Sequence, residues 1–327
     1  MPRHPTHTSA TPLLIPSARA NPPPRPSLFA PQYLFDYVAT IAVLGTSVFL
    51  DNVPEPFHRD FRVDDPRISM PMKPETVPSS LGWAVAFGGA AVIIALTWIV
   101  RALTKAPSDA RRRRGSVSEE TWWSETRRDI DGWGHVLGWD VHHAALGTVL
   151  SIALTQLLTN AIKLMVGQLR PDFLARCMPS LDLAQTCTNP NTSTIRDGRM
   201  SFPSGHSGRA AAGLGFAMWY LVAATGALNF DRRRPEGRVW KALVCLVPLL
   251  GVAAIAINRL QRNRHHVPDV VTGSVLGLLI SYVCYRYYYP AFSVKSTEAG
   301  KPKTGPLGDN SDNETGSRPG SGGNDES

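Results

Sequence analysis

Six long apolar runs alternate with charged connections along this chain, and they set the expected architecture. A helix needs about 20 apolar residues to cross the hydrocarbon core of a bilayer. Runs of that order occupy residues 33–50, 81–102, 141–166, 208–228, 240–257 and 267–287. Tyr and Trp stand at several of their ends, as is typical of the membrane interface. The pattern predicts an all-α, polytopic membrane protein with about six transmembrane helices.

The two ends of the chain have a different composition. The first thirty residues are rich in Pro and Ser, and the stretch after Ser293 is rich in Gly, Ser, Asn, Asp and Glu. Neither stretch has the apolar content that offsets the entropy of ordering a chain. We expect a disordered tail over residues 1–31, one membrane domain over 32–290 and a second disordered tail over 291–327. No continuous apolar core precedes Tyr33, so a removable signal peptide is not expected.

The formal net charge of +8 is clustered beside the apolar runs, which favours membrane topology over nucleic-acid binding. Arginines gather between the second and third runs and between the fourth and fifth, and the positive-inside rule makes those connections cytoplasmic. Six crossings place both tails on the same, cytoplasmic side. The loops over 52–80, 168–203 and 258–266 then face the non-cytoplasmic side, and the arginines within them need a separate explanation.

The second of these outer loops contains two candidate modifications. Cys177 and Cys187 share this polar loop and could form a disulfide, whereas Cys245 and Cys284 lie inside apolar runs. Asn191 begins the sequence NTS and is a candidate glycosylation acceptor.

The first of three motifs is KLMVGQLRP, at the outer end of the third run. Lys163 and Arg170 stand seven positions apart, so on a helix they lie on nearly the same face and can converge on an anion. Pro171 marks the end of the helix. The alternative is that both cations reach to the membrane interface with no ligand.

The second motif, FPSGHSGRAAAG, opens the fourth run. Ser204 offers a hydroxyl, Gly205 allows close approach to a backbone N–H, and the helix N-terminus favours an anion. His206 can act as a proton donor at this point. The alternative is an ordinary helix cap with an incidental histidine.

The third motif, NRLQRNRHHVPDV, separates the last two runs. If a helix begins near His265, Asp269 lies one turn further on the same face and can orient the imidazole, and Pro268 fits the first turn. Arg259 adds a cation. The alternative is a basic loop at the end of a membrane helix.

Topology places all three motifs at non-cytoplasmic helix ends. Lys163, Arg170 and Arg259 supply three positive charges, enough to hold a phosphate dianion, and two histidines can occupy opposite sides of it. Together they predict a site with a nucleophile, an acid and a cationic clamp.

These residues resemble the signature of the type 2 phosphatidic acid phosphatase (PAP2) superfamily, which reads K-x6-RP, then PSGH, then SR-x5-H-x3-D. The resemblance extends over the membrane region and implies a PAP2/haloperoxidase-like helical core. The chain looks most similar to fungal lipid phosphate phosphatases related to diacylglycerol pyrophosphate phosphatase, since its first outer loop, PEPFHRDFRVDDPRISMP, resembles theirs. One departure is Asn258, which replaces the usual Ser or Ala before the arginine, and we expect it to tune the site without abolishing activity.

The resemblance implies an integral membrane lipid phosphatase that acts through a phosphohistidine, without metal or cofactor. His265 would be the nucleophile, Asp269 would orient it and His206 would protonate the leaving oxygen. The phosphate would be bound by Lys163, Arg170, Ser204, Gly205 and Arg259. The site would face away from the cytoplasm.

The alternative interpretation is a catalytically silent phospholipid-binding protein of the same fold. Such proteins typically lack some of the motif residues, whereas this chain has all of them. A vanadate-dependent haloperoxidase is soluble, and a transporter is disfavoured because the cations lie at helix ends. The preferred headgroup stays open among phosphatidate, lysophosphatidate, diacylglycerol pyrophosphate and sphingoid-base phosphates. The membrane also stays open among vacuole, Golgi, endoplasmic reticulum and plasma membrane, as does the oligomeric state.

Overall fold

The computed structural model describes residues 31–113, 119–180, 186–228 and 239–289, with side chains described except at 32 and 102–139. The predicted disordered tails, 1–31 and 291–327, lie outside these ranges apart from Pro31.

Within the described ranges the chain is helical, and its one β-type pairing is an isolated bridge between Pro179 and Cys187. The elements in chain order are η1 (Pro31–Tyr33), α1 (Leu34–Asn52), α2 (Ser79–Ala84), the π-helical turn η2 (Val85–Gly89), α3 (Ala90–Arg113), α4 (Glu119–Val166), α5 (Phe173–Cys177), α6 (Thr192–Gly198), α7 (Gly205–Thr225), α8 (Val239–Gln261) and α9 (Val267–Tyr288). The prediction of an all-α fold is confirmed.

Five helical stretches in the described part of the chain are long and apolar enough to cross a membrane: Leu34–Asn52, Ser79–Arg101, Asp140–Val166, Val239–Gln261 and Val267–Tyr288. They coincide with five of the six predicted runs. The remaining run, 208–228, lies in α7, which begins three residues earlier than predicted and does not meet the same measure of length and composition. The physical reason is its sequence, because α7 is rich in Gly and Ala and carries Arg209.

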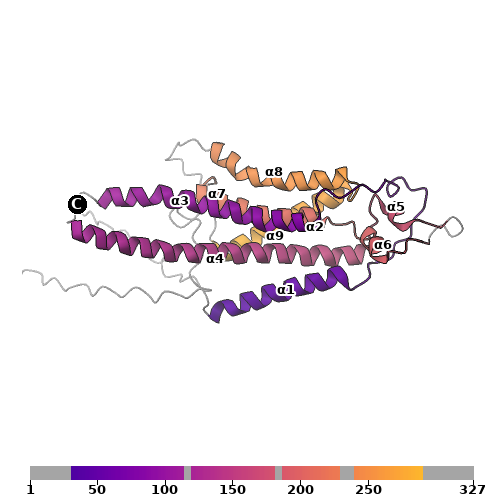
Figure 1. Ribbon diagram of the computed structural model, residues 1–327, viewed down its shortest axis with the longest axis horizontal. Coiled ribbons are helices and arrows are strands. Elements are labelled where there is room, and N and C mark those ends of the chain that lie inside the picture. Colours follow the sequence, from indigo (N-terminus) through magenta and orange to yellow (C-terminus); the bar gives the residue numbers. More distant parts are fainter. Residues whose placement is uncertain (1–30, 114–118, 181–185, 229–238, 290–327) are drawn as a thin grey trace, which may run out of the picture.

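Helix α7 is the centre of the bundle. It packs against α3, α4, α8, α9 and η2, and most of its residues are buried. Figure 1 shows α1, α3, α4 and α8 running along the long axis of the molecule around α7 and α9. Glycine permits this packing where backbones touch: a Cβ on Gly213 would lie 2.1 Å from the carbonyl oxygen of Ala86, and one on Gly277 would lie 2.3 Å from that of Gly208. A helix so enclosed does not need the composition of a lipid-facing span.

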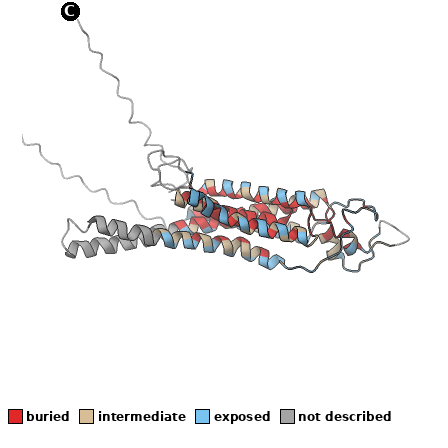
Figure 2. Cartoon of the chain, turned by 90° about the horizontal axis from the view of Figure 1, so that it is seen from above, coloured by how far each residue is buried: buried red, intermediate tan, exposed pale blue. Residues whose placement is uncertain are grey.

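The outer faces of the surrounding helices are apolar and exposed. On α8, for example, Trp240, Leu243, Leu246 and Leu250 point outward. Figure 2 shows burial concentrated inside the bundle and exposure along its outer faces. Hydrophobic side chains on the outside of such a bundle are what a lipid solvent requires, and the protein is an integral membrane protein.

The basic connection between the second and third runs differs from its prediction as a loop. Helix α3 continues to Arg113 and α4 begins at Glu119, so most of this connection is helical. The reason is local, since the segment contains many strong helix formers such as Ala, Arg and Glu.

Candidate active site

The three predicted motifs meet at one end of the bundle, where α4 and α8 end and α7 and α9 begin. This is the end that carries α5 and α6 (Figure 1). The Ser204 backbone N–H donates to the Asp269 carbonyl over 2.9 Å, which joins the starts of α7 and α9. Lys163, Arg259 and His265 all lie close enough to His206 to act on it electrostatically. The predicted residues therefore form one site.

Asp269 is fixed in the first turn of α9. Its Oδ2 accepts hydrogen bonds from the Ser201 hydroxyl at 2.5 Å and from the His266 backbone N–H at 2.9 Å. His265 Nδ1 lies 3.6 Å from the same oxygen, which is close for an ion pair but longer than a hydrogen bond. In the described residues this Nδ1 has no hydrogen-bond partner. His265 and Asp269 therefore lie together, as their spacing predicted. The distance between them has to shorten to a hydrogen bond before Asp269 can fix the tautomer of the His265 ring.

His265 and the neighbouring His266 have different environments. His265 is 3% exposed, and burial lowers its pKa to about 4. The positive charges of Arg170 and Lys163 also lower this pKa, whereas Asp269 raises it. His266 is partly exposed, its Nε2 lies 3.1 Å from the Arg67 carbonyl oxygen, and its contact with Asp269 raises its pKa. His265 is thus neutral at physiological pH, and no hydrogen bond among the described residues occupies its Nε2.

The start of α7 has the properties of an anion site. Ser204 is the N-cap, and its hydroxyl lies 3.1 Å from that of Ser207. A Cβ on Gly205 would lie 3.2 Å from the ammonium nitrogen of Lys163, so the start of α7 lies close to this cation. His206 Nε2 is buried with no hydrogen-bond partner in the described part of the chain. A helix N-terminus, a buried ammonium and an unpartnered imidazole nitrogen face the same region.

Lys163 and Arg170 are each 8% exposed, which excludes the reading that they extend to the membrane interface. Arg170 Nη2 contacts Asp197 Oδ1 at 2.6 Å, and its Nε donates to the Asp197 carbonyl at 2.8 Å. Arg176 binds the other oxygen of the same carboxylate at 2.7 Å. Burial alone would raise the pKa of Asp197, but these two guanidinium groups outweigh burial and lower the pKa to about 2. Asp197 is therefore ionised and positions Arg170.

Arg259 is 1% exposed and is held by a segment outside the three motifs, which contains Glu75 and Val77. Its Nη1 contacts Glu75 Oε1 at 2.9 Å, and its Nη2 donates to the Val77 carbonyl at 2.7 Å and to Asn258 Oδ1 at 2.8 Å. Asn258 Nδ2 in turn donates to the Thr76 hydroxyl. The unusual Asn258 thus links Arg259 to the segment before α2.

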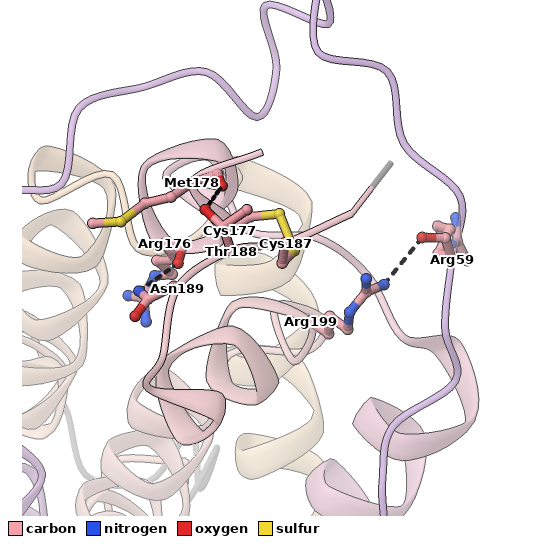
Figure 3. Close-up of a disulfide and its surroundings, with 8 residues drawn as sticks. All are labelled: Arg59, Arg176, Cys177, Met178, Cys187, Thr188, Asn189 and Arg199. Atoms are coloured by element: carbon pink, nitrogen blue, oxygen red, sulfur yellow. Dashed lines mark hydrogen bonds between the residues drawn. A yellow bond between two sulfur atoms is a disulfide. The ribbon is translucent and has the colours of Figure 1, made fainter. Parts of the chain in front are cut away.

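A disulfide joins Cys177 and Cys187 beside this site (Figure 3). In the same view Asn189 donates to the Arg176 carbonyl at 2.7 Å, and Arg199 donates to the Arg59 carbonyl at 3.1 Å. The disulfide and the Asn189 hydrogen bond brace α5, whose Arg176 helps to hold Asp197. Asn191, the candidate glycosylation acceptor, is exposed and caps α6 by accepting from the Thr194 backbone N–H.

Among the described residues no group of three or more His, Cys, Asp and Glu side chains could hold a metal ion. His142 and His143 lie in α4 more than twenty residues before Val166, so they are remote from the site. There they contact Tyr37 and Tyr33 respectively.

Four site residues were not recognised from the sequence: Glu75, Asp197, Ser201 and Arg209. The first three reach the motifs from loops or from a short helix, and no local pattern signals them. Arg209 stands inside the second motif, one turn after His206, and its charge in a run of small residues was the available signal.

The sequence model described as the PAP2 superfamily matches residues 144–293. The chain is 30% identical over 270 residues to lipid phosphate phosphatase 2 of Arabidopsis thaliana, covering 79% of this chain and 78% of that protein. It is 31% identical over 265 residues to probable diacylglycerol pyrophosphate phosphatase 1 of Schizosaccharomyces pombe, covering 78% and 81%.

A third relative, diacylglycerol pyrophosphate phosphatase 1 of Saccharomyces cerevisiae, is 39% identical over 158 residues, which is 46% of this chain and 53% of that protein. No solved structure matches the chain.

Proposed function

Because the chain belongs to the PAP2 superfamily, we propose that it removes phosphate from lipid headgroups through a covalent phosphohistidine at His265, without a metal ion. The observation that carries this proposal is a buried, neutral imidazole beside the carboxylate of Asp269, close to the ammonium of Lys163 and the N-terminus of α7. A neutral imidazole is a nucleophile, and the charges around it suit a phosphate dianion.

In the first step His265 Nε2 attacks phosphorus and forms the N–P bond while the bond to the lipid oxygen breaks. His206 gives its proton to that oxygen, so that the lipid leaves as an alcohol. Asp269 stabilises the positive charge that develops on the His265 ring. The contact of 3.6 Å between them shortens as the ring becomes cationic, because attraction to the carboxylate grows.

The remaining groups stabilise the phosphoryl oxygens. Lys163, Arg170 and Arg259 supply positive charge, and Ser204 and the Gly205 N–H supply hydrogen bonds. Phosphoryl transfer depends mainly on such positioning and electrostatic stabilisation. The three cations fill the part that divalent metals play in other phosphatases, which supports a metal-free reaction.

In the second step water attacks the phosphohistidine. Neutral His206 accepts a proton from the water, the N–P bond breaks, and phosphate leaves with both histidines restored. This reversal of roles follows from microscopic reversibility.

The positive-inside pattern supports an orientation in which this end of the bundle faces away from the cytoplasm. Substrates would then reach the site from the non-cytoplasmic leaflet. Phosphatidate, lysophosphatidate, diacylglycerol pyrophosphate and sphingoid-base phosphates all carry the required phosphate.

The test is phosphate release from these four lipids by purified protein in detergent, with excess EDTA and no added divalent ion. We expect turnover in EDTA, and no turnover by His265→Ala, which should still bind lipid phosphate. Normal turnover by His265→Ala would exclude the nucleophile. Loss of activity in EDTA with recovery on adding a divalent ion would exclude the metal-free reaction. Lipid binding by wild type with no turnover would instead support a silent binding protein.

A further inference from the structure

Arg209 is a buried cation that the mechanism above does not use. It lies in α7 one turn after His206, so the two side chains share a face of the helix. Arg209 is only 5% exposed. A guanidinium is always charged, and burying it is costly unless other groups compensate it.

The groups around Arg209 compensate its buried positive charge only in part. Its Nη1 donates to Gln156 Oε1 at 3.0 Å, its Nη2 lies 3.5 Å from the Ser79 hydroxyl, and its carbon atom Cζ stands 4.5 Å from the centre of the Trp83 ring. Its Nε is buried with no hydrogen-bond partner in the described residues. No carboxylate in that part of the chain forms an ion pair with it.

The two arginines predicted to bind phosphate differ from Arg209 in this respect. Arg170 is paired with Asp197, and Arg259 is paired with Glu75. Arg209 shares its unpaired state with Lys163, whose ammonium makes no hydrogen bond or ion pair within the described ranges. Among the cations of the site, Lys163 and Arg209 thus lack a counterion in the described residues, and an anionic ligand would supply the missing partner for both.

The position of Arg209 relates it to the reaction. Lys163 Nζ and Arg209 Nη1 lie 3.2 and 3.9 Å from the point where a Cβ on Gly205 would stand. A second reference point is the Cβ position of Gly82, which lies 3.7 Å from His206 Nε2 and 3.8 Å from Arg209 Nη2. The guanidinium therefore extends from the start of α7 to the flank of the His206 ring, where the mechanism proposed above puts the leaving group.

We propose that Arg209 binds the second, lipid-side phosphate of a pyrophosphate headgroup, and so favours pyrophosphate lipids over lipid monophosphates. The proposal rests on the function proposed above. The terminal phosphorus forms a bond to His265 Nε2, and its bond to the bridging oxygen breaks. That oxygen leaves as part of a lipid phosphate, taking a proton from His206. The leaving phosphate lies beside His206, within reach of Arg209.

The electrostatics of the pair agree with this assignment. A protonated His206 beside the Arg209 guanidinium is a repulsive pair of like charges. An anion between them converts that repulsion into two attractions. A pyrophosphate lipid brings such an anion, whereas a phosphomonoester brings only the neutral ester oxygen and a glycerol or sphingoid chain to that position.

The test compares diacylglycerol pyrophosphate and phosphatidate of identical acyl chains in the same detergent micelles. For Arg209→Gln we expect kcat/KM to fall about 30-fold for the pyrophosphate lipid and at most about threefold for phosphatidate, the loss of one charged contact. Arg209→Lys should recover part of the lost activity. The matched control is Arg196→Gln, because within the described residues the Arg196 guanidinium donates only to the carbonyls of Leu50, Asp51 and Pro54. That variant should affect both lipids equally.

A second measurement uses wild-type protein alone and does not depend on the folding of a variant. Inorganic pyrophosphate should inhibit phosphatidate turnover at a concentration about tenfold lower than inorganic phosphate does, because it reaches Arg209 as well as the clamp. Equal losses for both lipids in Arg209→Gln, or equal inhibition by the two anions, would overturn the proposal. Failure of the proposed function gives a different result, since wild type would then hydrolyse neither lipid.

Discussion

The two ends of the helical bundle both contain buried polar groups, but in the described part of the chain most of those without hydrogen-bond partners lie at one end. At the end away from the motifs, Tyr220 and Tyr289 donate to the two carboxylate oxygens of Asp140 at 2.5 and 2.9 Å, and Tyr33 contacts His143. At the motif end the buried atoms without hydrogen-bond partners include His206 Nε2, His265 Nδ1, Asp269 Oδ1 and the Nε atoms of Arg209 and Arg259, among the described residues.

This difference separates a structural cluster from a binding site. Buried polar groups normally satisfy one another, and an unsatisfied group reduces stability. Evolution tolerates that loss where a ligand supplies the missing partner. The Asp140 cluster should therefore contribute to stability and little to activity, whereas the motif end should contribute to activity at the expense of stability. Substitutions at the two ends can test that separation.

The largest effect is expected for Asp269→Asn. The amide preserves the shape of the side chain but cannot stabilise a cationic imidazole, so kcat should fall by about 10³-fold or more, as when a triad carboxylate is replaced by Asn. Phosphate release in detergent measures this. The control Asp64→Asn removes a carboxylate that pairs with Arg62 in an exposed loop, and it should leave kcat unchanged. A kcat within tenfold of wild type for Asp269→Asn would show that this carboxylate has no role in the chemistry.

Lys163→Met should lower activity without lowering stability. Its ammonium is buried and lacks a partner in the described residues, so its removal takes away a phosphate contact and also an uncompensated charge. We expect kcat/KM to fall about 100-fold. The Tm of the ligand-free protein should stay the same or rise. Lys241→Met, on α8 beside Trp240, is the matched control and should leave kcat/KM unchanged. If Lys163→Met had a lower Tm and normal activity, Lys163 would have a structural role and no role in phosphate binding.

The lowered pKa of His265 predicts the acid side of the pH profile. Burial brings that pKa to about 4, so His265 stays unprotonated as the pH falls through the ordinary histidine range and protonates only near pH 4. Between about pH 5.5 and 4.5 His265 should add no pH dependence of its own, so the second ionisation of the substrate phosphate, with a pKa of about 6, and the proton on His206 set the slope. The logarithm of kcat/KM should therefore rise by no more than about one for each pH unit in that interval. A slope of two would mean that His265 titrates near 6.5.

At the opposite end of the bundle, Tyr220→Phe should lower stability and leave activity intact. The substitution removes one of the hydroxyl donors to buried Asp140, at a cost of about 1–3 kcal/mol in the free energy of unfolding. Thermal unfolding in detergent measures the cost, with Tyr287→Phe as a control because the Tyr287 side chain is exposed. If Tyr220→Phe lowered kcat/KM of the folded protein tenfold, the two ends would be coupled and the separation would be wrong.

The sequence predicted five of the candidate membrane helices and the three motifs that meet at one end of the bundle, because each has a local signature. Apolar runs determine membrane helices, and four-residue spacing places His265 and Asp269 on one face. Glu75 and Ser201 were not predicted because their partners, Arg259 and Asp269, lie 184 and 68 positions away. Contacts of that length depend on how the helix ends meet. The predicted start of α7 lies three residues after the observed one. An enclosed helix can contain polar residues and glycines, whose low hydropathy resembles that of a loop beside a span.

The smallest effect is expected at Asn258, the departure from the family signature. Asn258 Oδ1 accepts from Arg259, while its Nδ2 donates to Thr76. Serine is too short to make both contacts, but Arg259 would keep Glu75 and the Val77 carbonyl. Asn258→Ser should therefore lower kcat/KM by about threefold, within the range of one neutral hydrogen bond.

Thr76→Ala breaks the other side of the same link, so the double variant with Asn258→Ser should lose no more than the larger single loss, as expected for residues that act through one contact. Steady-state kinetics of the two single variants and the double variant measure this. Additive losses would mean that Asn258 acts on Arg259 directly and independently of the segment before α2. A loss near that of Asp269→Asn would instead place Asn258 among the groups that the reaction requires, and would show that Glu75 and Val77 alone cannot hold Arg259 in position.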